Sequence, residues 1–387
     1  MRKSLFLFLC TIAVAGTLSG CAETGFRLSA GNESSASISS ADNAEIKEDN
    51  KEDNKEDEAL SGVSVFESIL GEFVSSSSVS EPEVEAEKTR FDKFMTDEEP
   101  VYFGMDIIKK LEWSTEFLSD NYFIEENTPY TISELISLLN DGLGAQTERP
   151  ELKVEYISYR TVECGVEKTP ALAVFFEGME LDSMAVEPLI IIMEKDDKLQ
   201  AVYGINSGYR SSTNVNDEGV VSYGGSDGAG AHSCSYTLID GEGNSVFLYS
   251  VRGMADYTWL YLGPDVHMDL YGIADEYGIA DNVFIEQYSF KPYDYEAAER
   301  DYFEFIKDDM FTYYAINSNG EVSEDEGVYE EGNDYRTVFD MTGLSLSTPS
   351  EINARIKELE ESYSLNPVAN SFGNSMWETI DPSKAFS

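Results

Sequence analysis

The chain has 387 residues and carries 74 acidic against 26 basic side chains, a formal charge of −48. Nucleic-acid binding depends on Lys and Arg that neutralise phosphates, so this balance argues against a nucleic-acid partner. It also argues against a surface that lies flat on anionic lipid, which needs basic patches. The acidic composition is compatible with cationic partners, and also with a role in solubility alone.

The amino terminus has the features of a signal peptide. Arg2 and Lys3 precede an apolar run from Leu5 to Ala15, which has the length of a signal-peptide core. That run is shorter than the roughly 20 apolar residues of a membrane-spanning helix. Leu18-Ser19-Gly20-Cys21 follows it. An ordinary secretory peptide with an accidental cysteine is the alternative interpretation.

Residues 1–21 resemble bacterial lipoprotein precursors, whose signal peptides end in such a lipobox. The resemblance implies removal of residues 1–20, diacylglyceryl transfer to the Cys21 thiol and, often, acylation of its amino group. It therefore implies lipid anchoring at the extracytoplasmic face of the cell membrane, with the acylated Cys21 as the contact with the bilayer. Two or three acyl chains anchor better than one, because each buried methylene contributes about 0.8 kcal/mol.

Residues 21–99 differ in composition from the rest of the chain. They contain serine-rich patches and a Lys-Glu-Asp-Asn repeat that begins at Lys47. A segment with low hydrophobicity and dense charge cannot bury enough apolar surface to offset its ordering entropy. We therefore expect a lipidated, disordered acidic stalk, with a fluctuating amphipathic helix at residues 63–74.

Two helices are predicted at the start of the ordered part, which we expect to begin near Val101. The first follows the apolar spacing of residues 105–118. The second begins at a capping box formed by Thr131 and Glu134 and is expected to end at Gly142.

Beyond residue 152 the apolar period changes to two, which predicts β-strands. Their short connections, rich in Gly, Asn and Asp, favour antiparallel hairpins. Residues 189–193 are apolar at consecutive positions, as expected of a strand that is covered on both faces. The expected strands are Leu152–Tyr159, Ala171–Glu177, Leu189–Glu194, Leu199–Asn206, Val220–Tyr223, Ser235–Ile239 and Val246–Val251.

Helices return after residue 264. The expected late elements are a core strand at Tyr257–Leu262, a helix capped by Asp265 that ends at Gly278, a helix from Asp294 through Phe305, strands at Phe311–Ile316 and Tyr335–Phe339, and a helix opened by a capping box at Thr348. This order indicates the α+β class, with an antiparallel β-sheet core and flanking helices. We expect residues 100–387 to form a single extracytoplasmic domain.

Two of the four cysteines remain once Cys10 is removed and Cys21 is lipidated. An extracytoplasmic compartment permits a disulfide between Cys164 and Cys234. Such a bridge would close a loop of about 70 residues and add roughly 4 kcal/mol of stability. The alternative, to which we give the same weight, is that both cysteines are buried free thiols.

Residues 224–228 match the hydrolase motif Gly-x-Ser-x-Gly, and His232 lies nearby. That motif needs a strand, a sharp turn and a helix, whereas residues 233–237 have the pattern of a strand, so no catalytic serine is expected. Two interpretations of a long Gly-rich hairpin loop at this segment stay open, and the first is that Ser226, Asp227 and His232 form a polar, adaptable rim that binds a ligand. The alternative is that the glycines only allow the sheet to bend.

No catalytic residue, metal ligand or cofactor-binding residue is predicted. The turn that begins at Asp240 starts like a calcium loop, but Ser245 in place of Gly and Val251 in place of Glu exclude an EF-hand. His267 has a carboxylate two residues away on each side, a spacing that points side chains apart on a helix.

Residues 198–252 are similar to uncharacterised lipoproteins of Gram-positive gut bacteria, on the strength of Leu199-Gln-Ala-Val-Tyr203, Gly219-Val-Val and Asp240-Gly-Glu-Gly. That resemblance implies that the chain belongs to this group. The group has no assigned activity, so the resemblance implies nothing about mechanism. We expect a membrane-anchored lipoprotein whose domain is a non-catalytic module that binds an extracellular ligand or an envelope protein. A secreted hydrolase of wall or dietary polymer and an accessory subunit of a transporter are the alternatives.

Overall fold

The computed structural model describes residues 87–113, 122–146, 153–181, 184–208, 210–228, 230–263, 268–323, 325–368, 371–372 and 376–386. The signal peptide, Cys21, most of the stalk and His267 lie outside these residues. Within them, no helix combines the length and the apolar character that crossing a membrane requires.

The ordered part begins before Val101, so the predicted boundary is wrong. Helix α1 (Arg90–Met95) opens with a capping box formed by Thr89 and Asp92, and its last two residues are buried. The helix has six residues, which is too few for a helical period to show in the sequence.

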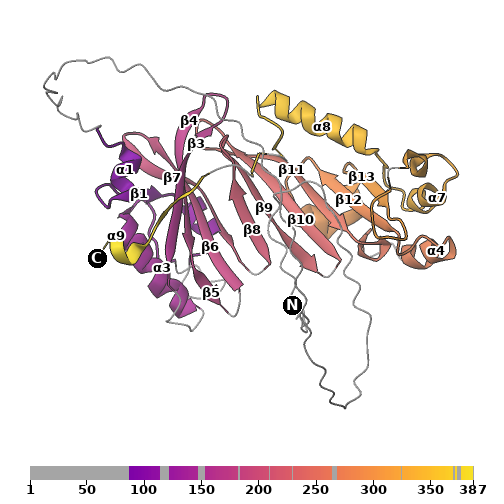
Figure 1. Cartoon of the computed structure of the whole chain (residues 1–387), viewed down its shortest axis with the longest axis horizontal. Coiled ribbons are helices and arrows are strands. Elements are labelled where there is room, and N and C mark those ends of the chain that lie inside the picture. Colours follow the sequence, from indigo (N-terminus) through magenta and orange to yellow (C-terminus); the bar gives the residue numbers. More distant parts are fainter. Residues whose placement is uncertain are drawn as a thin grey trace, which may run out of the picture. The chain divides into compact units, whose positions relative to one another are not determined.

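Residues 88–387 belong to one compact unit, and its described part contains two β-sheets flanked by helices (Figure 1). The fold is therefore α+β and largely antiparallel, as predicted. The first sheet has the order β14-β3-β4-β6-β7-β1-β2, with β5 paired to β6 and with β1 and β7 parallel. Its strands are β1 (Val101–Phe103), β2 (Pro129–Tyr130), β3 (Tyr156–Cys164), β4 (Thr169–Glu177), β5 (Met179–Leu181), β6 (Met184–Lys195), β7 (Lys198–Ser207) and β14 (Glu378–Ile380).

The second sheet is an antiparallel meander in the order β13-β12-β11-β10-β9-β8. Strands β8 and β12 are absent from the sequence-based expectation: β8 is polar, and β12 lies between two predicted helices. The strands of this sheet are β8 (Ser211–Val215), β9 (Val220–Gly228), β10 (Ala231–Ile239), β11 (Ser245–Met254), β12 (Val283–Ser289) and β13 (Met310–Ala315).

Helices precede, interrupt and follow these strands. Both predicted capping boxes are present: Thr131 N donates to Glu134 (2.9 Å) at the start of α3, and Thr348 caps α8. The helices are α2 (Met105–Leu111), α3 (Ile132–Gln146), η1 (Tyr257–Trp259), α4 (Leu270–Glu276), α5 (Tyr295–Arg300), α6 (Tyr302–Ile306), η2 (Glu326–Tyr329), α7 (Asp334–Asp340), α8 (Pro349–Ser362) and α9 (Pro382–Ala385).

The first sheet is covered on both faces. Alternate residues of β4 and β6 enter two different cores, one shared with α1, α2 and α3 and the other with the second sheet. The first core includes Val174, Phe176 and Ile190, and the second includes Phe175, Ile191 and Val221. This confirms the expectation for residues 189–193, because neither face of β6 is left to solvent.

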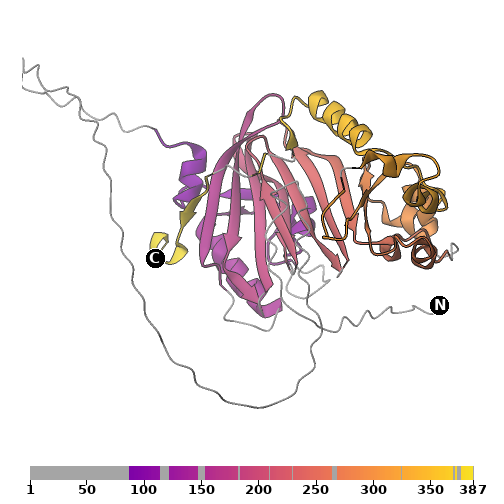
Figure 2. The same ribbon diagram turned by 45° about the vertical axis from the view of Figure 1, so that its right-hand side comes forward.

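The second sheet is covered unevenly. On one face, Val215 and Val221 pack against the first sheet, while Met254 and Ile285 pack against η1, α4, α6 and α7. The opposite face packs against α8, which runs along the second sheet in both views (Figures 1 and 2), and against the segment that contains Val368.

The strand predicted at Tyr335–Phe339 is wrong, because these residues form α7. Asn333 opens the helix by accepting a hydrogen bond from Tyr335 N. The β-branched and aromatic side chains favour a strand locally. Val338 and Phe339 are nevertheless adjacent and both fully buried in the core beside the second sheet, which a helix face allows.

The helix expected over residues 105–118 is shorter than predicted, because α2 ends at Leu111 and Glu112 takes a left-handed conformation.

Other predicted elements also differ from the structure. Gly142 does not end α3: a Cβ there would lie 2.5 Å from the Phe123 ring, so the glycine permits close packing inside the helix. Asp301 divides the helix predicted from Asp294 into α5 and α6 by capping the second of them. The strand expected at 257–262 is the short helix η1 and a loop.

Candidate functional site

The Gly-rich segment is a short hairpin, so the prediction of a long loop is wrong. Strand β9 continues to Gly228, and β10 begins at Ala231. A Cβ on Gly225 would lie 2.3 Å from the carbonyl oxygen of Arg210, and one on Gly230 would lie 2.2 Å from Nε1 of Trp259. These two glycines allow a neighbouring backbone and an indole ring to approach the strands closely.

The structure does not bring the three predicted loop residues to one place. Ser226 and His232 are directly opposite each other in the β9–β10 register. The Ser226 hydroxyl donates to the carbonyl of Gly228 at 2.7 Å. Asp227 instead accepts a hydrogen bond from Ser233 (3.0 Å) and pairs with Arg252 (3.3 Å), on the other face of the sheet. A strand also follows the Gly-x-Ser-x-Gly motif here, so the helix that a nucleophilic serine needs is not in that position.

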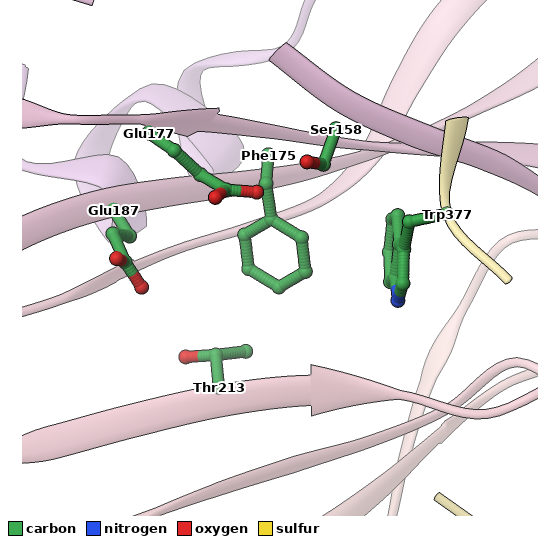
Figure 3. A pocket seen from close by; sticks show the side chains of 6 residues that line it. All are labelled: Ser158, Phe175, Glu177, Glu187, Thr213 and Trp377. Atoms are coloured by element: carbon green, nitrogen blue, oxygen red, sulfur yellow. The ribbon is translucent and has the colours of Figure 1, made fainter. Parts of the chain in front are cut away.

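A cleft of about 230 Å³ lies where the two sheets meet (Figure 3). Its walls come from four strands and from the segment just before β14, which are far apart in the sequence. The lining residues are Ser158, Phe175, Glu177, Glu187, Thr213 and Trp377.

One end of the cleft is aromatic. The rings of Phe175 and Trp377 have centroids 5.1 Å apart and an interplanar angle of 60°. The guanidinium of Arg160 lies 5.0 Å from the Trp377 ring, and its Nη2 donates to the carbonyl of Val215 at 2.7 Å. Arg160 is buried, and this burial lowers its pKa. Because Arg160 is in β3 and Val215 is in β8, the arginine links the two sheets and holds Trp377 in place.

The other end of the cleft is polar. Figure 3 shows Trp377 on one side of the Phe175 ring and the carboxylates of Glu177 and Glu187 on the other. The hydroxyl oxygen of Thr213 is buried and has no hydrogen-bond partner among the described residues. Burying a hydroxyl without a hydrogen-bond partner costs about 1–3 kcal/mol. A ligand that supplies the missing hydrogen bond would therefore bind with a more favourable free energy.

A second concavity, of about 310 Å³, lies beside the turn that begins at Asp240. The Asp240 carboxylate accepts hydrogen bonds from Glu242 N (2.9 Å) and from Asn244 N (2.7 Å). Burial raises the pKa of Asp240, but these hydrogen bonds outweigh it and hold the pKa below its usual value. The turn therefore uses its carboxylate internally. Within the described ranges, no three His, Cys, Asp or Glu side chains are grouped so as to hold a metal ion.

Both cysteines of the domain are buried thiols that are not joined to each other. The structure therefore contains no disulfide between Cys164 and Cys234. Burial raises the pKa of Cys164 to about 12, with the nearby Asp240 carboxylate adding to the effect. Its thiolate is scarce at neutral pH, which makes it a poor nucleophile.

The sequence-based prediction assigned none of the cleft residues to a site. The sequence did contain one signal for the cleft. Ser158, Glu177 and Thr213 are polar residues at strand positions that face a core. Trp377 had no such signal, because it enters the site from a segment that pairs with β3 more than 200 residues away in the chain.

The sequence matches no protein-family model, no curated protein and no solved structure. What the chain does is therefore inferred from its own residues.

Proposed function

We propose that this chain is a lipid-anchored extracytoplasmic protein that binds a ligand in the cleft between its two sheets. The lipobox at residues 18–21 and the acidic composition that follows it support the anchoring and the location. The observation that carries the binding role is the Thr213 hydroxyl, buried without a partner at the edge of a cleft that also presents aromatic rings. Concave sites with aromatic walls and a few convergent polar groups are typical of ligand binding.

The cleft favours recognition over chemistry. The Trp377 and Phe175 rings offer stacking surfaces, Thr213 offers a hydrogen bond, and the two carboxylates accept hydrogen bonds from donors on the ligand. A hydrolase is the second candidate, because Glu177 and Glu187 line the same cleft and glycoside hydrolysis uses two carboxylates. Replacement of either glutamate by glutamine would abolish hydrolysis if the protein is a hydrolase. In a binding protein the same change would only lower the affinity for the ligand.

Anchoring is tested at Cys21. In the producing bacterium, Cys21→Ala should prevent lipid attachment and normal processing, because the thiol is the acceptor of the diacylglyceryl group. Mass spectrometry of the mature amino terminus would show an acylated Cys21 in the wild type. An unmodified terminus at another residue would contradict the anchoring proposal.

The binding role is tested with Trp377→Ala and the neighbouring control Met376→Ala. Met376 is 92 % exposed, so its truncation leaves the cleft intact. A thermal-shift screen with amino acids, polyamines and neutral oligosaccharides should find a compound that stabilises the wild type and the control but not Trp377→Ala. At a concentration of 100 Kd, such a compound stabilises by about 2.7 kcal/mol. Equal shifts in all three proteins would place the ligand outside the cleft.

A further inference from the structure

A row of hydroxyl side chains crosses five strands of the second sheet and begins at Thr213. Residues directly opposite each other in antiparallel strands share a face. In the observed register, Thr213 is opposite Tyr223, Tyr223 is opposite Ser235, Ser235 is opposite Ser250, and Ser250 is opposite Ser289. With strands about 4.8 Å apart, the row spans roughly 19 Å. All five residues are partly exposed.

A second row lies beside the first on the same face. It consists of Ser211, Gly225, Ser233, Arg252 and Gln287. We call the ten residues of the two rows the hydroxyl band. The band lies between the apolar residues that face the first sheet, such as Val221, and those that face the helices, such as Met254. Its members belong to neither of these cores.

Arg252 is the one charged residue of the band, and a carboxylate beside the band compensates its charge. Arg252 pairs with Asp227 at 3.3 Å, and the Ser233 hydroxyl donates to the same carboxylate at 3.0 Å. Four serine hydroxyls of the band donate within the protein, so their oxygens are acceptors for a ligand: Ser211 donates to Gly208, Ser233 to Asp227, Ser235 to Tyr223 and Ser289 to Lys291.

Exposed tyrosines lie beyond the Arg252 edge of the band. Tyr302, which contacts Arg252, packs against Tyr261 with ring centroids 5.0 Å apart. Tyr293 packs against Tyr295 at 4.8 Å. Tyr261, Tyr293 and Tyr295 are 51 %, 54 % and 76 % exposed. The band therefore runs from Thr213 in the cleft to an aromatic surface outside it.

We propose that the hydroxyl band binds an extended neutral glycan, with the cleft receiving one end of it. This rests on the proposed function and names the ligand class. Closely spaced hydroxyls match a polyhydroxylated polymer, and aromatic rings at both ends stack on the apolar faces of sugar rings. The charge of −48 disfavours a polyanion. A protein partner would bury an apolar centre, whereas the centre of the band includes the hydroxyls of Tyr223, Ser235 and Ser250.

The test uses the full chain and neutral hexasaccharides of glucose and of N-acetylglucosamine in titration calorimetry. Ser250→Phe places a bulky ring within the band and should lower the affinity at least tenfold. Thr213→Val keeps the side-chain shape, removes one hydrogen bond and should lower it about fivefold. The matched control is Ser212→Phe, because Ser212 is exposed and lies next to Thr213 on the opposite face of β8; its affinity should stay within twofold. Melting curves establish that all three variants fold.

Three results would overturn the inference: an equal loss of affinity in Ser212→Phe and Ser250→Phe, no loss in Ser250→Phe, or binding of an oligolysine peptide without binding of any neutral glycan. Failure here is distinguishable from failure of the proposed function. If Trp377→Ala loses a small ligand while no glycan binds the wild type, the cleft function stands and the glycan inference falls.

Discussion

Gly230 should tolerate no side chain, because the indole of Trp259 occupies the space where a Cβ would be. A Cβ at this position would lie 2.2 Å from Nε1 and within 3.0 Å of two further ring carbons, far below van der Waals contact. The φ angle of Gly230 is outside the left-handed region, so alanine adds no backbone strain and the penalty is steric alone. Overpacking of this kind costs about 1–3 kcal/mol.

Gly208 is the matched control. Its φ is also outside the left-handed region, and no heavy atom of the described chain lies within 4 Å of its Cβ position. Gly208→Ala should therefore stabilise by about 0.4–1 kcal/mol through the unfolded state. The two alanine variants should differ by roughly 1.5–4 kcal/mol in the free energy of unfolding, measured as shifts of the urea midpoint.

The cause is isolated by a double-mutant cycle. In a Trp259→Ala background the ring is gone, so Gly230→Ala should cost much less than in the wild type. If Gly230→Ala costs the same in both backgrounds, or behaves like Gly208→Ala, then Trp259 is not the reason for the glycine.

Three further outcomes are expected. Thr348→Ala should lower stability by about 1 kcal/mol in urea unfolding, because the N-cap of α8 loses its side-chain hydrogen bond; an unchanged midpoint would contradict this. Cys164, with a pKa raised to about 12 by burial, should react with iodoacetamide at pH 8 only after unfolding, as peptide mass spectrometry would show. Burial, aided by Glu218, raises the pKa of Glu360, although a hydrogen bond from Val368 N opposes the shift. A raised native pKa means stability that is present at low pH and lost as pH rises through that pKa. Glu360→Gln keeps the acceptor oxygen, so it should melt higher than the wild type at pH 7 and lose that advantage near pH 4; a wild type that melts higher at pH 7 would refute this.

Local chemistry was readable from the sequence where neighbouring residues decide the structure. The capping boxes at Thr131 and Thr348 need only residues within four positions, and both are present. The period-two pattern likewise located the four longest strands of the first sheet and four of the six strands of the second, because alternation reflects the two faces of a single strand.

Pairing between distant segments decided the rest. The residues 335–339 have strand propensity, yet burial of Val338 and Phe339 against the second sheet makes them a helix. The three predicted loop residues do not lie together. The β9–β10 register places Ser226 opposite His232, whereas Asp227 pairs with Arg252 on the other face of the sheet.

The sequence by itself determined the α+β class, the helix starts, the strand periodicity and the resemblance at Cys21, each of which is encoded in a short stretch of chain. Only the tertiary structure decided which residues form the cleft. The cleft joins Thr213 of one sheet to Phe175 of the other and to Trp377 near the carboxyl end. Strand register and sheet packing bring such residues together, and both depend on the burial of apolar faces across the whole domain, which no local spacing encodes.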